Sequence, residues 1–294
     1  MRTICAELLS TTRRLSSWIQ DYALAWAGLA ETYRQRAARG YVPFDDGYAR
    51  AREAANRALE ADDTLAESWA TLGRIRRAYD WDWAGADEAF GRALELEPRN
   101  AEVLRGAASL AANLGRPDQA IELTRRAVDL DPLLVSSYHN LGLYSYFAGR
   151  LDQAESALEK ALELNPGGPV AHSLLARVYL AWSQPERALE EIESEPHPAF
   201  RLFGLALVQH ALDQKLEAQA ALDELVDTWG SQAAYQIAEI HAFRGEVDQA
   251  FEWLERAYVE RDPGTAEVRV DPLLIGLQDD PRWPGFLRKI RLAN

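Results

Sequence analysis

The sequence predicts an all-α protein, a right-handed superhelix of about seven helix-turn-helix repeats that ends in a C-terminal capping helix. Two recurring phrases predict it. The first phrase closes on a proline every 34 residues and spans Arg92–Pro98, Arg126–Pro132 and Lys160–Pro166. The second phrase, Gly-x-x-Asp-Gln-Ala, begins at Gly115, Gly149 and Gly245. Because the two phrases stay in phase with each other, they mark a repeated structural unit.

Each recurring residue type has a physical role in a pair of helices. A glycine can adopt the left-handed backbone that ends the first helix. The aspartate three residues later falls in the first turn of the second helix, where a carboxylate meets unpaired N–H groups. The closing proline cannot continue a helix. Small residues at Gly142 and Ala154 let two helix backbones approach, and Leu158 fills the seam between them.

These residues resemble the tetratricopeptide repeat family, whose unit is two antiparallel helices in 34 residues. Trp69, Leu72 and Gly73 fit the first helix of one unit, and Phe90 and Pro98 fit its second helix and its end. The resemblance implies an array over residues 23–263, with repeats that start near residues 23, 66, 101, 135, 169, 199 and 231. Because repeats bury their apolar faces only by stacking, we expect one elongated array.

The two ends of the chain depart from the repeat. We interpret residues 1–22 as an N-terminal helical cap or partial repeat, and residues 264–294 as a C-terminal cap. The apolar stripe for the C-terminal cap consists of Leu273, Leu274, Leu277, Trp283, Phe286, Leu287 and Ile290.

Two internal segments also depart from the period. About nine extra residues lie between Tyr33 and Ala51, which predicts a longer loop between the two helices, accompanied by an extended first helix. Residues 79–83 carry one residue more than the standard unit. There Asp82 is placed to cap a helix, and two tryptophans pack over the turn in preference to holding a ligand.

The first repeat, the Asp-Trp-Asp-Trp insertion and the Asp-Pro-containing tail are similar to one bacterial subgroup of the family. In that subgroup the repeats form the C-terminal region of adenylate-cyclase-like proteins, winged-helix transcription regulators and serine/threonine kinases. The resemblance implies a regulatory or partner-binding half of a signalling protein. Residues 1–20 themselves carry no cyclase, kinase or DNA-binding pattern.

Composition excludes several function classes. The formal charge of -14 argues against binding to nucleic acid or to an anionic membrane. A lone Cys5 makes neither an internal disulfide nor a thiolate metal site. The five histidines are scattered, and no phosphate loop or nucleophile motif appears. We therefore expect a cytoplasmic protein that is not an enzyme, with no cofactor and no metal.

The first helices of such repeats line a concave face, and side chains that packing does not use point into it. Arginines there offer a planar fork for carboxylates, and aromatic rings beside them offer buried anchors. The alternative is that these arginines pair locally with Glu31, Glu67 and Glu102. The predicted groove residues are Arg34, Arg74, Arg77, Arg105, Asn113, His139, Tyr146, Phe147, Arg177, Phe203, His210 and Tyr235.

The sequence thus favours a scaffold that binds a protein or an extended or helical peptide of acidic character in this groove, as a monomer or homodimer. The alternative is a ligand-sensing or regulatory module that acts on a separate cyclase, kinase or transcription regulator. A third interpretation, an enzyme with a site built across repeats, would require converging titratable residues.

Overall fold

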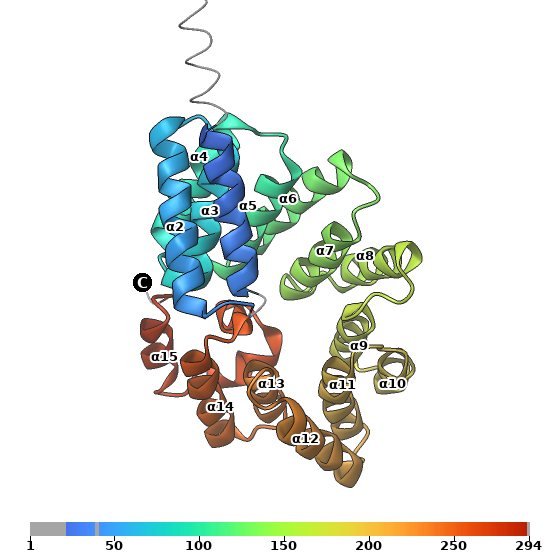
Figure 1. Ribbon diagram of the computed structural model, residues 1–294. Helices are drawn as coiled ribbons and strands as arrows, with labels where there is room; N and C mark the ends of the chain where they lie inside the picture. Colours follow the sequence, from blue (N-terminus) through green and yellow to red (C-terminus); the bar gives the residue numbers. More distant parts are fainter. Residues whose placement is uncertain (1–21, 39–40, 293–294) are drawn as a thin grey trace, which may run out of the picture. The chain divides into compact units, whose positions relative to one another are not determined.

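The structure is a computed structural model that describes residues 22–38 and 41–292 of the chain. The described residues form helices and turns and contain no strand, so the predicted all-α class is confirmed (Figure 1). The chain divides into two compact units, one up to Leu110 and one from Ala111 onward. The predicted N-terminal cap lies outside the described residues except for Tyr22.

The first unit consists of helix pairs. Its helices are the one over residues 22–38, α2 (Phe44–Ala61), α3 (Ala66–Ile75), η1 (Arg76–Asp80), α4 (Trp83–Leu96) and the start of α5 (Ala101–Asn113). The extra residues before Ala51 lengthen both helices of the first pair, which leaves a short connection between residue 38 and Phe44. The predicted extension of the first helix is therefore confirmed, and residues 39–40 of the predicted loop lie outside the described residues.

The extra residue at positions 79–83 is absorbed by a π-helical turn. Residues Arg76–Asp80 form the π-helix η1, a form that accommodates one residue more than an α-helical turn. Trp81 then has a left-handed backbone (φ 49°), and Asp82 accepts a hydrogen bond from the Gly85 N–H at 3.0 Å. Trp81 and Trp83 are each 6% exposed, so both tryptophans pack structurally as predicted.

The second unit continues the helix pairs. Its helices are α6 (Pro117–Leu130), α7 (Val135–Phe147), α8 (Leu151–Leu164), α9 (Ala171–Ala181), α10 (Pro185–Glu193), α11 (Pro198–Ala211), α12 (Lys215–Trp229), α13 (Ala234–Phe243), α14 (Val247–Glu260), η2 (Pro263–Glu267), η3 (Pro272–Leu277) and α15 (Trp283–Lys289). Within each pair the two helices pack closely, and the first helices also contact one another in order. We call α7, α9, α11 and α13 the first-helix layer.

The turns and seams follow the recurring residues. Gly115, Gly149 and Gly245 have φ values of 73°, 68° and 75°, which confirms the left-handed ends of the first helices. A Cβ at Gly142 would lie 2.5 Å from Cγ of Leu158, so only glycine allows α7 and α8 to pack this closely. The predicted aspartates also lie in the first turns of their second helices, at Asp118, Asp152 and Asp248.

Two carboxylates, one buried and one half-buried, cap first helices from outside the recurring phrases. Glu195, after α10, accepts hydrogen bonds from the backbone N–H groups of Val170 and Ser173 at the start of α9. Asp262, after α14, accepts one from the Tyr235 N–H at the start of α13. In both pairs the chain that leaves the second helix therefore supplies a carboxylate that accepts hydrogen bonds from the backbone N–H groups at the start of the first helix.

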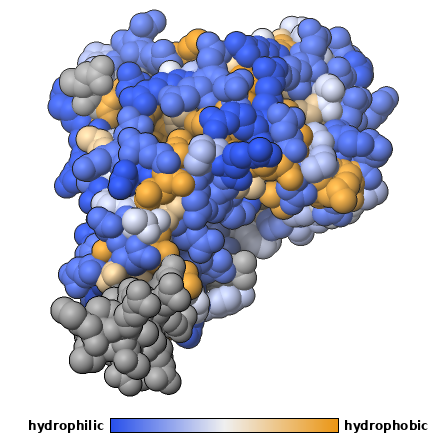
Figure 2. Space-filling model, turned by 90° about the horizontal axis from the view of Figure 1, so that it is seen from above, coloured by the Kyte–Doolittle hydropathy of each residue, from blue (hydrophilic) through white to orange (hydrophobic). Residues whose placement is uncertain are grey.

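The C-terminal residues bury most of their predicted apolar stripe. Leu274, Leu277, Trp283, Phe286 and Ile290 are at most 6% exposed. The face shown in Figure 2 is mostly hydrophilic, with hydrophobic residues lying among hydrophilic ones. In the described part of the chain, no helix combines the length and apolar character needed to span a membrane.

Candidate functional site

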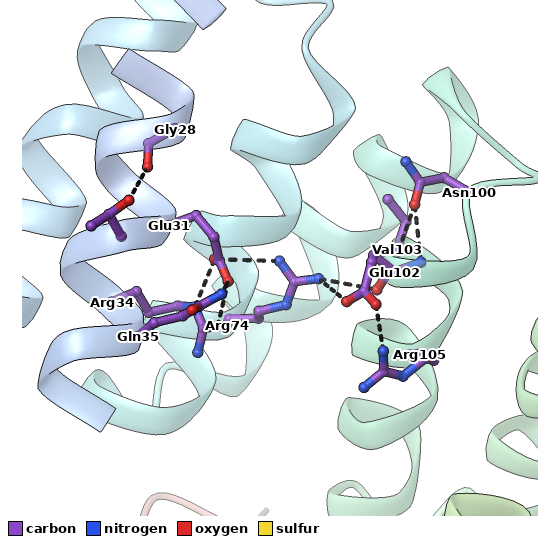
Figure 3. Close-up of polar contacts among 10 residues, drawn as sticks. Gly28, Glu31, Arg34, Gln35, Arg74, Asn100, Glu102, Val103 and Arg105 are labelled. Atoms are coloured by element: carbon purple, nitrogen blue, oxygen red, sulfur yellow. Dashed lines mark hydrogen bonds and ion pairs between the residues drawn. The ribbon is translucent and has the colours of Figure 1, made fainter. Parts of the chain in front are cut away.

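Three predicted groove arginines form a row in the first unit, which we call the arginine row: Arg34, Arg74 and Arg105. They come from three successive first helices, those over residues 22–38, α3 and α5 (Figure 3). Two glutamates alternate with them. Arg34 donates two hydrogen bonds to Glu31 at 2.6 and 2.8 Å, and Arg105 donates to Glu102. The row therefore contains one more cation than anion.

Arg74 occupies the middle of the arginine row and joins its two ends. Its guanidinium lies 3.9 Å from a Glu31 carboxylate oxygen and 3.6 Å from a Glu102 carboxylate oxygen. It also donates a 3.1 Å hydrogen bond to the Glu102 backbone carbonyl. Glu31 and Glu102 therefore pair with the arginines locally, as the alternative expectation required, and their side chains are still 33% and 60% exposed.

Burial and ion pairing shift the pKa values of the arginine row in opposite directions. Burial lowers the pKa of Arg74, and the nearby positive charges of Arg34 and Arg105 lower it further. For Glu31, burial by itself raises the pKa, but the hydrogen bonds and charge of Arg34 outweigh burial, so the net pKa is lowered. The lowered pKa of Arg74 therefore reflects its burial beside two other cations, which its two glutamate partners offset only in part.

A second group of predicted groove residues meets inside the second unit, around Arg177. Arg177 on α9 is 7% exposed and donates hydrogen bonds of 3.0 Å to both carboxylate oxygens of Asp271. Glu239 on α13 lies 3.2 Å from the same guanidinium, and the Tyr235 hydroxyl donates to Asp271 at 3.3 Å. We call Tyr146, Arg177, Phe203, Tyr235, Glu239 and Asp271 the Arg177 cluster.

Aromatic rings enclose this guanidinium. The Arg177 guanidinium carbon lies 4.8 Å from the ring centre of Tyr146 on α7 and 6.0 Å from that of Phe203 on α11. Burial raises the pKa of Tyr146 to about 12. Burial and the charge of Asp271 raise the pKa of Glu239 well above its ordinary value, which favours the protonated form. The cluster is a buried, nearly charge-balanced carboxylate site.

The Arg177 cluster corrects one part of the sequence prediction. Tyr146, Arg177, Phe203 and Tyr235 are at most 7% exposed, so they do not lie on an open surface. The physical reason is that the chain's own residues from Asp262 to Leu277 cover them, which the repeat pattern does not reveal. The same residues do form a site in which an arginine flanked by aromatic rings binds a carboxylate, but this carboxylate belongs to Asp271 of the same chain.

The remaining predicted groove residues lie outside both groups. Asn113 and His139 are largely buried, and burial lowers the pKa of His139. Phe147 packs beside Tyr146, and His210 meets the edge of Phe243 with ring centres 6.0 Å apart. Arg77 is half-buried at the end of α3, in η1.

Sequence reasoning missed Glu239 and Asp271. Asp271 lies 94 positions from Arg177, beyond any helical periodicity, and the Asp-Pro dipeptide at 271–272 was noted only as part of the tail. The one available signal for Glu239 is a charged residue within the otherwise apolar run of a first helix, between Ala238 and Ile240. Within the residues that the structure describes, no group of His, Cys, Asp and Glu could hold a metal ion.

Comparisons with known proteins agree with this architecture. One tetratricopeptide repeat model matches residues 82–141 and 148–194, and a second matches residues 203–266, which together make up more than half of the chain. The chain belongs to the tetratricopeptide repeat family.

Curated relatives match over parts of their length. The photosystem I assembly protein Ycf3 of Parasynechococcus marenigrum (strain WH8102) is 34% identical over 106 residues, 30% of this chain and 61% of that protein. A small glutamine-rich tetratricopeptide repeat-containing protein 2 from Mycosarcoma maydis is 32% identical over 95 residues, 32% of this chain. The chain spans 27% of that fungal protein and 19% of the Arabidopsis thaliana CTR9 homolog.

Solved structures share the fold. Pseudomonas aeruginosa PilF is 22% identical with a TM-score of 0.58, covering 79% of this chain and 99% of that chain. A tetratricopeptide repeat protein from Parabacteroides merdae is 16% identical with a TM-score of 0.60, covering 86% of this chain and 100% of the other. Tetratricopeptide repeat proteins generally mediate protein–protein interactions.

Proposed function

We propose that this chain is a cytoplasmic, non-enzymatic scaffold that binds an acidic protein or peptide partner on the faces of its first helices. The observation that carries the proposal is the arginine row of the first unit. Three arginines from three successive first helices lie along one surface of a chain whose formal charge is -14. This local reversal of sign is the feature that an acidic partner would recognise.

A carboxylate of a bound protein or peptide can replace the two glutamates that pair with the arginine row. Arg105 and Arg34 bind glutamates three residues away on their own helices, and exposed pairs of this kind contribute only about 0–1 kcal/mol. A partner carboxylate can therefore take the place of Glu31 or Glu102 at small cost. The guanidinium forks then hold it in bidentate geometry.

A relative's name supports a scaffold role. Ycf3, 34% identical over 106 residues, is named as an assembly protein of photosystem I. The regulatory alternative is a special case of the same function, in which the captured partner is a cyclase, kinase or transcription regulator. Both forms use the same binding face, so one experiment tests them and the identity of the partner separates them.

The test is affinity capture from a lysate of the source cells, with Arg74→Gln/Arg105→Gln compared with wild type by quantitative mass spectrometry. Arg92→Gln is the matched control: it also binds a glutamate three residues away, but it lies on the second helix α4. We expect at least one partner to be retained by wild type and by Arg92→Gln and to be depleted about ten-fold with the double variant.

Equal recovery of every protein by the three chains would overturn the proposal. Circular dichroism of each variant confirms that the helices remain formed. Salt dependence provides a second readout, because a partner held by exposed charge pairs should dissociate more readily as ionic strength rises.

A further inference from the structure

The first-helix layer of the second unit holds a segment of its own chain, residues 262–277, which we call the C-terminal segment. The segment starts at the cap that Asp262 provides to α13 and continues through the short 3-10 helices η2 and η3. It packs tightly: a Cβ at Gly264 would lie 2.4 Å from Cδ1 of Tyr235, and Val268 and Leu274 are fully buried. Further along, Arg269 lies over the turn at Gly115.

All four helices of the first-helix layer contribute to the site around the C-terminal segment. Tyr146 comes from α7, Arg177 from α9, Phe203 from α11, and Tyr235 and Glu239 from α13. Arg177 and Tyr235 donate hydrogen bonds to the Asp271 carboxylate, and the rings of Tyr146 and Phe203 flank the Arg177 guanidinium. Residues from helices spread over about a hundred positions therefore meet at one aspartate.

Two further features make Asp271 resemble a bound ligand. It is followed by Pro272 and two leucines, and Leu273 packs against the apolar cluster formed by α11, α12 and α13. The segment around it forms two short 3-10 helices in place of another helix pair, so its place depends on side-chain contacts made to the layer.

We propose that the Arg177 cluster is a peptide-carboxylate site that the C-terminal segment occupies in cis, and that a partner peptide with an aspartate followed by apolar residues displaces it. The proposal rests on the proposed function, because it assigns a second site to the same scaffold and gives its partner a sequence character. The segment then acts as a tethered competitor that keeps the site closed until a stronger ligand arrives.

The energetics allow such displacement. A buried ion pair gains little net free energy over leaving both charges in water, so the Arg177–Asp271 contact specifies the occupant more than it stabilises it. A tethered segment competes at an effective concentration on the order of millimolar, so a free copy of the same peptide should bind the wild-type chain poorly. Weakening the tethered copy should open the site to the free one.

The experiment titrates a fluorescent peptide of residues 262–278, with blocked ends, with three full-length chains: wild type, Asp271→Asn and Asp279→Asn. Asp279 is the matched control because it is an exposed aspartate eight residues further along the chain. We expect Asp271→Asn to bind the peptide at least ten-fold more tightly than the other two chains. A peptide that carries Asp271→Asn itself should lose this binding. Equal affinity of the three chains for the peptide would overturn the proposal.

Hydrogen exchange measured by mass spectrometry shows whether the C-terminal segment moves independently. In Asp271→Asn, we expect exchange of residues 263–277 to rise at least ten-fold while α9 and α11 stay protected. A uniform rise across these helices would mean that the segment is part of the core, and would overturn the proposal.

The outcome is separable from that of the lysate capture. Peptide binding by Asp271→Asn, together with no partner that depends on the arginine row, would support this site and refute the proposed function. A captured partner with no gain of peptide binding would do the reverse.

Discussion

The two arginine sites of this chain use the same residue types with opposite degrees of burial. In the arginine row, Arg74 has 17% of its side chain exposed and its partner Glu102 has 60%. In the Arg177 cluster, Arg177 and Asp271 have 8% and 0%. In the first site Arg34 and Arg105 pair with glutamates one turn away on their own helices, whereas Arg177 pairs with a residue 94 positions away.

The comparison teaches that burial decides what an arginine–carboxylate contact does. In the arginine row the glutamates keep 33% and 60% of their side chains exposed, so their contacts exchange with solvent more readily than those of the Arg177 cluster and contribute less to stability. In the buried cluster the loss of either partner leaves the other charge without its counter-charge, so the contact ties the C-terminal segment to the first-helix layer. The row therefore suits reversible recognition, and the cluster suits holding one defined occupant.

The largest effect is expected from Arg177→Met. The substitution leaves the Asp271 carboxylate buried without its counter-charge, so we expect the free energy of unfolding of the second unit to fall by about 3–5 kcal/mol. Protection of amides in α9 and α13 against hydrogen exchange measures this loss locally. A loss below about 1 kcal/mol would show that the cluster is solvated and would remove the contrast with the arginine row.

The control for this prediction is Arg187→Met. Arg187 also binds a glutamate and lies 4.0 Å from a tyrosine ring centre, but 52% of its side chain is exposed. We expect it to cost no more than about 1 kcal/mol. Adding Asp271→Asn to Arg177→Met should recover part of the loss, because the stranded charge is removed.

A change of pH is expected to have a smaller effect on stability, with opposite signs at the two sites. The pKa of Glu239 is raised in the folded chain, so the folded state holds a proton that the unfolded state loses above its ordinary pKa. The stability linked to Glu239 is therefore fully present below the unfolded pKa and is lost as pH rises through the folded one. Glu239→Gln should abolish this decline in the second unit, with Glu224→Gln on the exposed face of α12 as the control.

Glu31 gives the opposite dependence in the first unit. Its pKa is lowered, so its contribution is present above the unfolded pKa and is lost as pH falls through the folded one. Denaturant unfolding of each variant between pH 4 and pH 8, followed by amide exchange, separates the two trends. If Glu239→Gln and wild type changed in parallel over this range, Glu239 would titrate alike in the folded and unfolded chains, and burial in the cluster would not raise its pKa.

The sequence predicts the fold well because the same local structural requirements recur in each helix pair. Gly149 and Gly245 need a left-handed backbone, and Gly142 needs to approach Leu158, and these demands depend only on neighbours within one helix pair. The Arg34–Glu31 and Arg105–Glu102 ion pairs are equally local, and the sequence predicts them as the alternative to a free groove.

The Arg177 cluster lies beyond this kind of reasoning. Its contacts join α9 to a segment that breaks the repeat, and nothing in the periodicity says where such a segment folds. The sequence predicts Arg177 and Tyr235 on the concave face, as side chains that packing within the repeat does not use. What they bind could be read only from the structure.

The smallest effect is expected from Arg105→Gln in the arginine row. The variant removes one guanidinium that pairs with Glu102, a carboxylate with 60% of its side chain exposed, so we expect the first unit to lose no more than about 1 kcal/mol. Added salt should shrink this difference further, because exposed pairs are screened. Amide exchange of α3 and α4 measures the loss, and Arg92→Gln should match it because Arg92 makes the same i,i+3 pair on α4. A loss of several kcal/mol for Arg105→Gln alone would mean that the row, like the Arg177 cluster, holds the fold together, and a partner could then not exchange its carboxylates without unfolding the unit.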